Sequence, residues 1–338
     1  AIASAAEAAT IRITRAPAFS ELLVKHEQAW RHRWARFAVD VDADTSTRLA
    51  VNLSTFHLLQ TLSRHTVGVD AGVPARGLHG EGYRGHVFWD ELFVFPLLTL
   101  RTPELTRALL GYRWRRLDEA RTAAREAGLR GALFPWQSGS DGREQTPEAL
   151  FNARAGRWKP DNSRLQRHVG LAVAYNVWSY FQATGDVDFL ADRGTELLVE
   201  VSRLFASLAT RDLGDGRYDI AGVMGPDEYH DGYPDAAEPG LRTNAYTNVL
   251  AAWVLARTGD AVQLLAGHHC GELWERIEVT DEELKQFERI SRNLRVCFHD
   301  RVISQFDGYD RLAELDWDAY RARYGNIGRL DLILHAEG

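Results

Sequence analysis

Apolar residues that recur at every third or fourth position are the feature of this sequence that most constrains its fold. One such stripe comprises Phe189, Leu190, Leu197, Leu198, Val201, Leu204, Phe205 and Leu208. A second comprises His168, Leu171, Ala172, Tyr175, Trp178 and Phe181. This spacing gathers the side chains on one face of an α-helix, which then packs on a core. Between the stripes, Gly185 is a typical helix stop and Asp186 a typical N-cap, so the sequence predicts an antiparallel pair of helices.

Further helix signals are spread along the chain, whereas strand signals are scarce. The pair Thr102-Pro103 is typical of a cap followed by a first-turn proline, and Thr280 with Glu283 forms a capping box. A helix is also expected over residues 47–65, where leucine and phenylalanine follow helical spacing. The sequence therefore predicts an all-α protein.

Size, charge and cysteine content exclude several classes of protein. With 338 residues, 45% of them apolar, the chain can bury a large core in one or two domains. The net charge of −7 and the interspersed charges argue against a nucleic-acid partner. Cys270 and Cys297 are too few for a disulfide framework, and we expect them to be reduced. No apolar run approaches the roughly 18 residues of a membrane helix. Residues 1–9 lack the features of a signal peptide. We therefore expect a cytoplasmic protein with no membrane partner.

Three glycine-rich stretches, residues 68–85, 128–160 and 214–240, are longer than ordinary loops and are therefore candidates for function. The first leads into Trp89 and Asp90, which would offer a sugar ring an apolar face beside a hydrogen-bond acceptor. An equally good interpretation is a buried tryptophan followed by a helix N-cap, because Asp90 precedes an apolar run. The second carries Trp136, for which an ordinary surface loop is the alternative.

The third stretch places two adjacent carboxylates, Asp227 and Glu228, between a Gly-Pro turn and Tyr229. Desolvation beside an aromatic ring would raise the pKa of one carboxyl, which a general acid needs near neutral pH, and Glu228 is the better candidate. A solvated acidic turn is the alternative. The histidines and the aspartate of these stretches lack the spacing of a zinc site, so no metal is expected.

At these residues the sequence resembles glycoside hydrolase family 65, which comprises the maltose, trehalose, kojibiose and nigerose phosphorylases and their relatives. The motifs that carry the resemblance are Glu81-Gly82-Tyr83-Arg84-Gly85-His86-Val87-Phe88-Trp89-Asp90, Gly225-Pro226-Asp227-Glu228-Tyr229-His230, Asn244-Ala245-Tyr246-Thr247-Asn248 and Tyr324-Gly325-Asn326-Ile327-Gly328-Arg329. The resemblance covers most of the chain. It implies an (α/α)6 barrel of the six-hairpin glycosidase type, with the active site in the loops at one end.

The resemblance also implies a reaction and the residues that perform it. Glu228 matches the general acid of the family, and Trp89 and Asp90 match residues that contact the glucosyl ring. We further expect four residues to bind substrate, namely Trp136, His86, Tyr229 and Asn244. The implied reaction is an inverting phosphorolysis of an α-linked glucose disaccharide to β-glucose 1-phosphate, with inorganic phosphate as co-substrate and no other cofactor. The resemblance also suggests a homodimer.

Two positions depart from the family pattern. Gln137 stands where some members carry Glu, and Arg242-Thr243 precedes the motif at Asn244, where an Asp-Asn pair is common. These departures concern the choice of acceptor sugar more than the type of reaction.

The organisation that the resemblance implies is that of a partial domain. We assign residues 1–40 to linker helices, because the segment around Trp30 and Trp34 resembles them, and residues 41–338 to a partial (α/α)6 catalytic barrel. The N-terminal β-sandwich of the family is expected to be absent and the barrel to be incomplete at its C-terminal end, since about eight of twelve helices are counted. The chain also begins without methionine. As given, it is expected to be inactive.

Two other functions stay open on the sequence alone. An inverting α-glucoside hydrolase on the same fold would need a second carboxylate, such as Glu81 or Glu144, that faces Glu228 across the pocket. A sugar-binding protein without catalysis would keep Trp89, Asp90 and Trp136 but leave Glu228 exposed and far from the ring.

Overall fold

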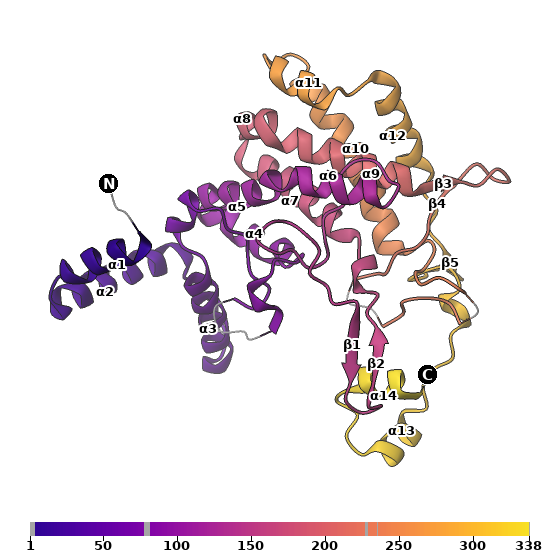
Figure 1. The fold of residues 1–338 in the computed structure, drawn as a ribbon, viewed down its shortest axis with the longest axis horizontal. Coiled ribbons are helices and arrows are strands. Elements are labelled where there is room, and N and C mark those ends of the chain that lie inside the picture. The colour runs from indigo at the N-terminus through magenta and orange to yellow at the C-terminus, as the bar shows by residue number, and fades with distance from the viewer. Residues whose placement is uncertain (1–3, 78–81, 227–228, 235, 338) are drawn as a thin grey trace. The chain divides into compact units, whose positions relative to one another are not determined.

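The computed structural model describes residues 4–77, 82–226, 229–234 and 236–337, and it is mostly helical with three short β-hairpins (Figure 1). Contacts divide the chain into two compact units, Ala1–Leu62 and Ser63–Gly338. The assignment of residues 1–40 to linker helices and of 41–338 to a partial barrel stays a prediction. None of the described helices is both long enough and apolar enough to cross a membrane.

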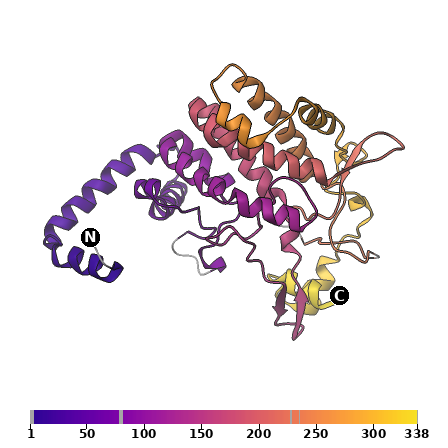
Figure 2. The same ribbon diagram turned by 45° about the horizontal axis from the view of Figure 1, so that its top comes forward.

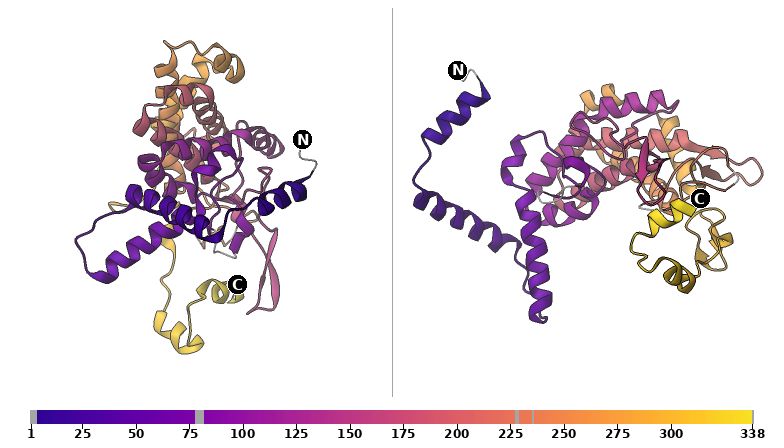
Figure 3. Two further views of the ribbon diagram at one scale, coloured as in Figure 1. Left: turned by 90° about the vertical axis from the view of Figure 1, so that its left-hand side faces the viewer. Right: turned by 60° about the horizontal axis from the view of Figure 1, so that its bottom comes forward.

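The first unit consists of three helices, α1 (Ala5–Thr14), α2 (Phe19–Phe37) and α3 (Thr45–Thr61), which Figure 3 shows as successive rods. Short polar side chains start two of them, since Ser4 caps α1 and Asp44 caps α3. The rings of Trp30 and Phe56 lie 5.1 Å apart and join α2 to α3. This unit carries many exposed apolar side chains, among them Phe19 and Leu49.

The second unit holds the longer helical core. Its helices are α4 (Glu91–Arg101), α5 (Pro103–Arg115), α6 (Leu117–Glu126), α7 (His168–Thr184), α8 (Val187–Phe189), α9 (Thr195–Leu208), α10 (Ala245–Leu265), α11 (Gly271–Ile277), α12 (Asp281–Asn293), α13 (Trp317–Tyr324) and α14 (Leu330–Glu337). Helices α7, α9 and α10 pack on one another, α4 and α5 pack on α7, and α12 packs on α10 (Figures 1 and 2).

The helix pair predicted from the two apolar stripes is present as α7 and α9. Gly185 ends α7 in the left-handed region, with φ of 67°, and the side chain of Asp186 accepts a hydrogen bond of 2.9 Å from the Phe189 amide. The short helix α8 and a π turn, η4 (Leu190–Gly194), then lead into α9. Several leucines of α9 are fully buried, as the apolar stripe predicts.

The predicted helix starts at Thr280 and Thr102 differ in outcome. The Glu283 amide donates to the Thr280 hydroxyl over 3.2 Å at the start of α12, so the N-cap half of the predicted capping box is confirmed, whereas the Glu283 carboxylate accepts from Arg130 and Arg203. Pro103 is the first residue of α5, but the Thr102 hydroxyl donates back to the Leu98 carbonyl and makes no cap. The predicted cap was wrong because α4 ends directly before α5 and its last carbonyls compete for the same hydroxyl.

The strands form three antiparallel hairpins: β1 (Ala149–Asn152) with β2 (Arg157–Pro160), β3 (Ala209–Arg211) with β4 (Tyr218–Ile220), and β5 (Phe298–His299) with β6 (Val302–Ile303). The Asn152 side chain donates to the Leu332 carbonyl and so ties β1 to α14. Short 3₁₀ turns, η1 (Arg64–Gly68), η2 (Gly82–Gly85), η3 (Ser163–Leu165) and η5 (Tyr309–Arg311), lie in the connections.

One glycine fixes the loop that follows α6. Gly131 has φ of 79°, and a Cβ atom at this position would lie 2.1 Å from the Glu200 carbonyl oxygen in α9. The next amide, that of Ala132, donates to the same carbonyl over 3.0 Å. Only glycine allows this close approach, so the loop that carries Trp136 starts from a position fixed against the core.

Candidate active site

Aromatic side chains from four segments meet at one place in the second unit. The His168 ring lies 4.8 Å from Trp89, 5.5 Å from Trp136 and 5.7 Å from Tyr246, each distance taken between ring centroids. These contacts are edge to face, the arrangement that aromatic rings prefer. We call these four residues the aromatic cluster. Trp89 and Tyr246 are half-buried, so this cluster is partly open to solvent.

The aromatic cluster lies where three helices begin. Trp89 comes just before α4, His168 is the first residue of α7, and Tyr246 lies in the first turn of α10. The first amides of a helix have no carbonyl partner within it, and the peptide dipoles sum to a partial positive charge at that end. The three helices therefore direct positive potential toward the cluster.

His168 forms the centre of this cluster and is fully buried. Neither ring nitrogen makes a hydrogen bond of ordinary geometry within the described part of the chain. Burial lowers the pKa of His168 to about 3, an effect that the nearby Met224 backbone partly opposes. The imidazole is therefore neutral near pH 7 and packs as an uncharged aromatic ring against both tryptophans.

A buried ion pair supports the backbone that leads into Trp89. The Arg113 Nε donates to Glu91 Oε2 over 2.9 Å, and the Arg113 Nη2 donates to the Phe88 carbonyl over 2.6 Å. Both charged side chains are about 1% exposed. Burial raises the pKa of Glu91, and the charge of Arg113 opposes that rise. The pair thus fixes the chain at Phe88 and, with it, the position of Trp89.

The loop of Trp136 is held by one carboxylate. Glu144 accepts hydrogen bonds from the amides of Trp136 (2.8 Å), Gln137 (3.0 Å) and Thr146 (3.1 Å), and from the Thr146 hydroxyl (2.7 Å). The Gln137 amide nitrogen lies 2.6 Å from His86 Nδ1, which joins this loop to the stretch before Trp89. Glu144 had been a candidate base for a hydrolase, and the structure gives it this structural role.

The segment that carries Glu228 is anchored on both sides, although Asp227 and Glu228 themselves lie outside the described residues. The Met224 amide donates to the Leu165 carbonyl over 3.0 Å, and the Asn162 side chain donates to Asp231 over 2.8 Å. Both anchors come from the turn just before His168. The ends of the 225–230 segment therefore lie beside the start of α7.

The other predicted substrate-binding residues have different surroundings. Asn244 is fully buried, and its side-chain oxygen accepts from the Thr247 amide over 3.1 Å, which caps α10. This contact favours a structural role for Asn244. Tyr229 is 57% exposed. Asp90 is half-buried at the first turn of α4, without the cap bond that a helix N-cap would make.

Comparison with known proteins identifies the family. Residues 52–338 match the model of the glycosyl hydrolase family 65 central catalytic domain. The chain belongs to this family. The family resemblance inferred from the motifs at Trp89, Glu228 and Asn244 is therefore confirmed.

Two family 65 relatives and one solved structure illustrate the similarity. The chain is 55% identical over 320 residues to an uncharacterized glycosyl hydrolase of Mycobacterium tuberculosis, covering 95% of this chain and 24% of the relative. It is 40% identical over 329 residues to the trehalose 6-phosphate phosphorylase of Lactococcus lactis, covering 96% of this chain and 41% of that enzyme. The chain thus spans between about a quarter and two-fifths of the length of these relatives.

The solved structure of a putative kojibiose phosphorylase from the human microbiome matches with a TM-score of 0.77 at 22% identity, covering 93% of this chain and 43% of that chain. This likeness bears on the fold, and it confirms the predicted all-α class with helices of an (α/α)6 barrel.

Sequence reasoning missed two kinds of site residue in this family 65 domain. His168 and Tyr246 were taken as parts of helical and family motifs, and their contact with the tryptophans follows only from the packing of α4, α7 and α10. Arg113 is one of three arginines in α5, and no sequence signal marks it as the one that is buried with a partner. Among the described residues, no group of three or more His, Cys, Asp or Glu side chains is placed to hold a metal ion.

Proposed function

We propose that the protein containing this domain catalyses the inverting phosphorolysis of an α-linked glucose disaccharide. Glu228 would donate its proton to the glycosidic oxygen as the bond from that oxygen to the anomeric carbon breaks. An oxygen of inorganic phosphate attacks the anomeric carbon from the opposite face and forms the new bond. The proton of the attacking hydrogen phosphate then returns to Glu228, and the products are β-glucose 1-phosphate and the released acceptor, so atoms and charge balance without a further cofactor.

The observation that carries this proposal is the aromatic cluster at the start of three helices. The half-buried faces of Trp89 and Tyr246 suit a sugar ring, which binds aromatic faces through its C–H groups. The positive ends of α4, α7 and α10 favour an anionic reactant such as phosphate at the same place. The 40% identity to a trehalose 6-phosphate phosphorylase supports the same type of reaction.

The geometry of Glu144 favours phosphorolysis over hydrolysis. A general base needs a carboxylate that is directed at water, whereas Glu144 accepts four hydrogen bonds from its own loop, three at Oε1 and one at Oε2, so its orientation is set by the loop. Phosphate is already an anion and needs no base. The second candidate base, Glu81, lies outside the described residues.

The test is release of glucose 1-phosphate by the intact protein that contains this chain. The substrates are trehalose, trehalose 6-phosphate, kojibiose, maltose and nigerose, each with and without inorganic phosphate. Glu228→Gln removes the acid proton while keeping the size of the side chain. Glu238→Gln is the matched control, because Glu238 is an exposed carboxylate of the same glycine-rich stretch, residues 214–240.

Two results are expected if the proposal is correct. Glucose 1-phosphate forms only when phosphate is present, and Glu228→Gln lowers kcat by about 100-fold or more, the usual range for loss of a general acid, while the control keeps wild-type activity. Free glucose released equally without phosphate would instead establish a hydrolase. No turnover of any α-glucoside, with sugar binding intact, would favour the binding protein.

A further inference from the structure

Arg167, just before α7, carries a charge for which the described residues supply no carboxylate partner. Its side chain is half-buried, and its Nε and Nη1 atoms are shielded from solvent without a hydrogen-bond partner in the described part of the chain. Burial lowers the pKa of Arg167, and the positive charge of Arg164 lowers it further. Arginine nevertheless stays charged in proteins, so two like charges lie close together here.

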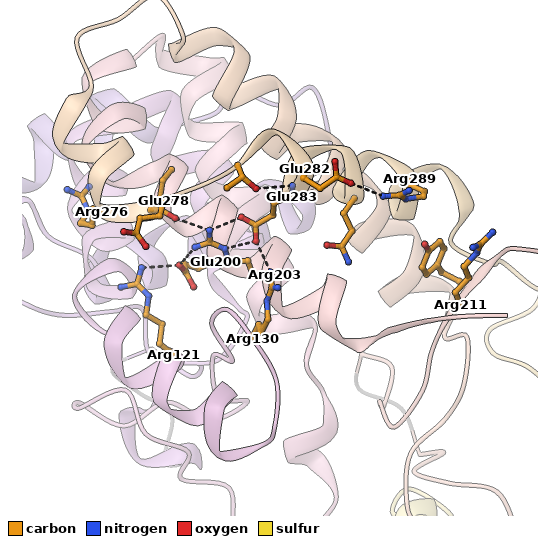
Figure 4. A pocket seen from close by; sticks show the side chains of 14 residues that line it. Arg121, Arg130, Glu200, Arg203, Arg211, Arg276, Glu278, Glu282, Glu283 and Arg289 are labelled. Atoms are coloured by element: carbon orange, nitrogen blue, oxygen red, sulfur yellow. Dashed lines mark hydrogen bonds and ion pairs between the residues drawn. The ribbon is translucent and has the colours of Figure 1, made fainter. Parts of the chain in front are cut away.

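The other arginines of the molecule show how unusual this is. Each further described arginine with a buried or half-buried side chain contacts a carboxylate or a carbonyl, for example Arg107 with Asp186 and Arg33 with the Leu59 carbonyl. Figure 4 shows another case, in which Arg203 contacts Glu200 and Glu283 in a charged groove. Such pairing offsets the cost of taking a guanidinium out of water. At Arg167 nothing described does so.

The place of Arg167 connects it with the candidate active site. The next residue, His168, contacts Trp89 and Trp136. Arg164 lies in η3, which ends two residues before Arg167, and the Leu165 carbonyl of the same turn accepts from the Met224 amide, directly before the segment of the predicted acid. The amides at the start of α7 add positive potential at the same point. The charges therefore gather beside the proposed reaction centre and not on a remote surface.

We propose that Arg167, assisted by Arg164, binds a phosphoryl group of the reactants. This inference rests on the proposed function. A guanidinium forms paired hydrogen bonds to phosphate oxygens, and a neutral sugar hydroxyl would leave the burial of this charge without compensation. Two sources of the group fit the chemistry. One is inorganic phosphate, and the other is a phosphate ester on the sugar, the kind of substrate for which the 40% identical relative is named.

The experiment compares Arg167→Gln, Arg167→Lys and Arg164→Gln with the wild type in the intact protein. Arg211→Gln is the matched control, because Arg211 is an exposed arginine of β3 that lines the charged groove. Two quantities are measured: the KM for inorganic phosphate, and kcat/KM for trehalose and for trehalose 6-phosphate. Binding of inorganic phosphate and of glucose 6-phosphate is also measured by calorimetry, which needs no turnover.

The two sources predict different results. If the ester is bound, Arg167→Gln lowers kcat/KM for trehalose 6-phosphate and the affinity for glucose 6-phosphate by about 10- to 100-fold, the range for loss of a charge-assisted hydrogen bond. The values for trehalose then stay within about twofold. If inorganic phosphate is bound, its KM rises by a similar factor with both disaccharides. In either case Arg167→Lys recovers part of the loss, because it restores the charge without the paired geometry.

Other results would overturn the inference. One is an unchanged affinity of Arg167→Gln for both inorganic phosphate and glucose 6-phosphate. Another is an equal loss of kcat on every substrate with an unchanged KM for phosphate, which would indicate that Arg167 has only a structural role. Failure of the proposed function is distinguishable. A protein that releases no glucose 1-phosphate but loses glucose 6-phosphate binding in Arg167→Gln would retain the phosphoryl site without the reaction.

Discussion

Replacing Arg113 by methionine would leave the Glu91 carboxylate in the core without its partner. The wild-type pair is about 1% exposed, with a 2.9 Å bond between Arg113 Nε and Glu91 Oε2. Methionine is close to arginine in length and is apolar, so it fills the space without supplying a donor. The same substitution removes the donor to the Phe88 carbonyl, which lies next to Trp89.

The expected loss of unfolding free energy is about 3–5 kcal/mol at pH 7, the range for breaking a buried ion pair from one side. The loss depends on pH. Burial raises the pKa of Glu91 in the folded protein above its ordinary 4.5, and without Arg113 it rises further. The folded state is then penalised wherever the unfolded carboxyl is ionised, which is above about pH 4.5. The cost of Arg113→Met is therefore largest near neutrality and shrinks as the pH falls toward 4.5.

The assay is urea unfolding of wild type and Arg113→Met at pH 7 and pH 5, followed by tryptophan fluorescence. The double variant Glu91→Leu, Arg113→Met removes both charges and is the informative companion. Replacing a buried pair by apolar residues is often close to neutral, so most of the lost stability should return. In the intact protein, the proposed phosphorolysis should slow in both variants, because the Phe88 carbonyl stays without its donor.

A loss below about 1 kcal/mol for Arg113→Met would refute this reasoning, because such a value is typical of exposed pairs. A loss that grows toward pH 5 would contradict the assigned direction of the Glu91 pKa. A double variant less stable than Arg113→Met would show that the carboxylate has a further partner.

Two more predictions concern His168 in the aromatic cluster and Gly131 in the loop that follows α6. His168 has a pKa of about 3 when folded and about 6.5 when unfolded, so it costs the wild type stability as the pH falls below 6.5. His168→Phe should therefore lose about 2 kcal/mol less than the wild type between pH 8 and pH 5 in urea unfolding, and an equal pH dependence would contradict this. Gly131→Ala should destabilise by about 1–3 kcal/mol more than Gly156→Ala, because both have positive φ but only Gly131 faces backbone at 2.1 Å. Equal melting temperatures of the two variants would exclude the steric account.

Much of the helical fold could be predicted from local signals. The stop at Gly185 and the cap at Thr280 depend on residues close in sequence, and the structure contains both. The cap at Thr102 was wrong because the end of a neighbouring helix, at Leu98, supplied a competing acceptor. The division after Leu62 depends on which helices contact one another, which periodicity does not report.

The candidate site shows the same limit more strongly. Trp89, Trp136 and His86 were chosen from their loops, and the structure brings their segments together. Asparagine is a preferred N-cap residue, and the Asn244 side chain does accept from the Thr247 amide. The family motif gave Asn244 a substrate-binding role instead. The position of His168 between two tryptophans depends on three helices that are distant in sequence.

The bonds of Glu144 have a consequence for how this domain can diverge. The backbone from Trp136 to Thr146 is held by a carboxylate inside the loop, and no bond of that set depends on the side chains in between. Side chains such as Gln137 can therefore be exchanged without remodelling the path of the chain. The path of this loop is therefore independent of the identity of its intervening side chains, which can be substituted one at a time while Glu144 is kept.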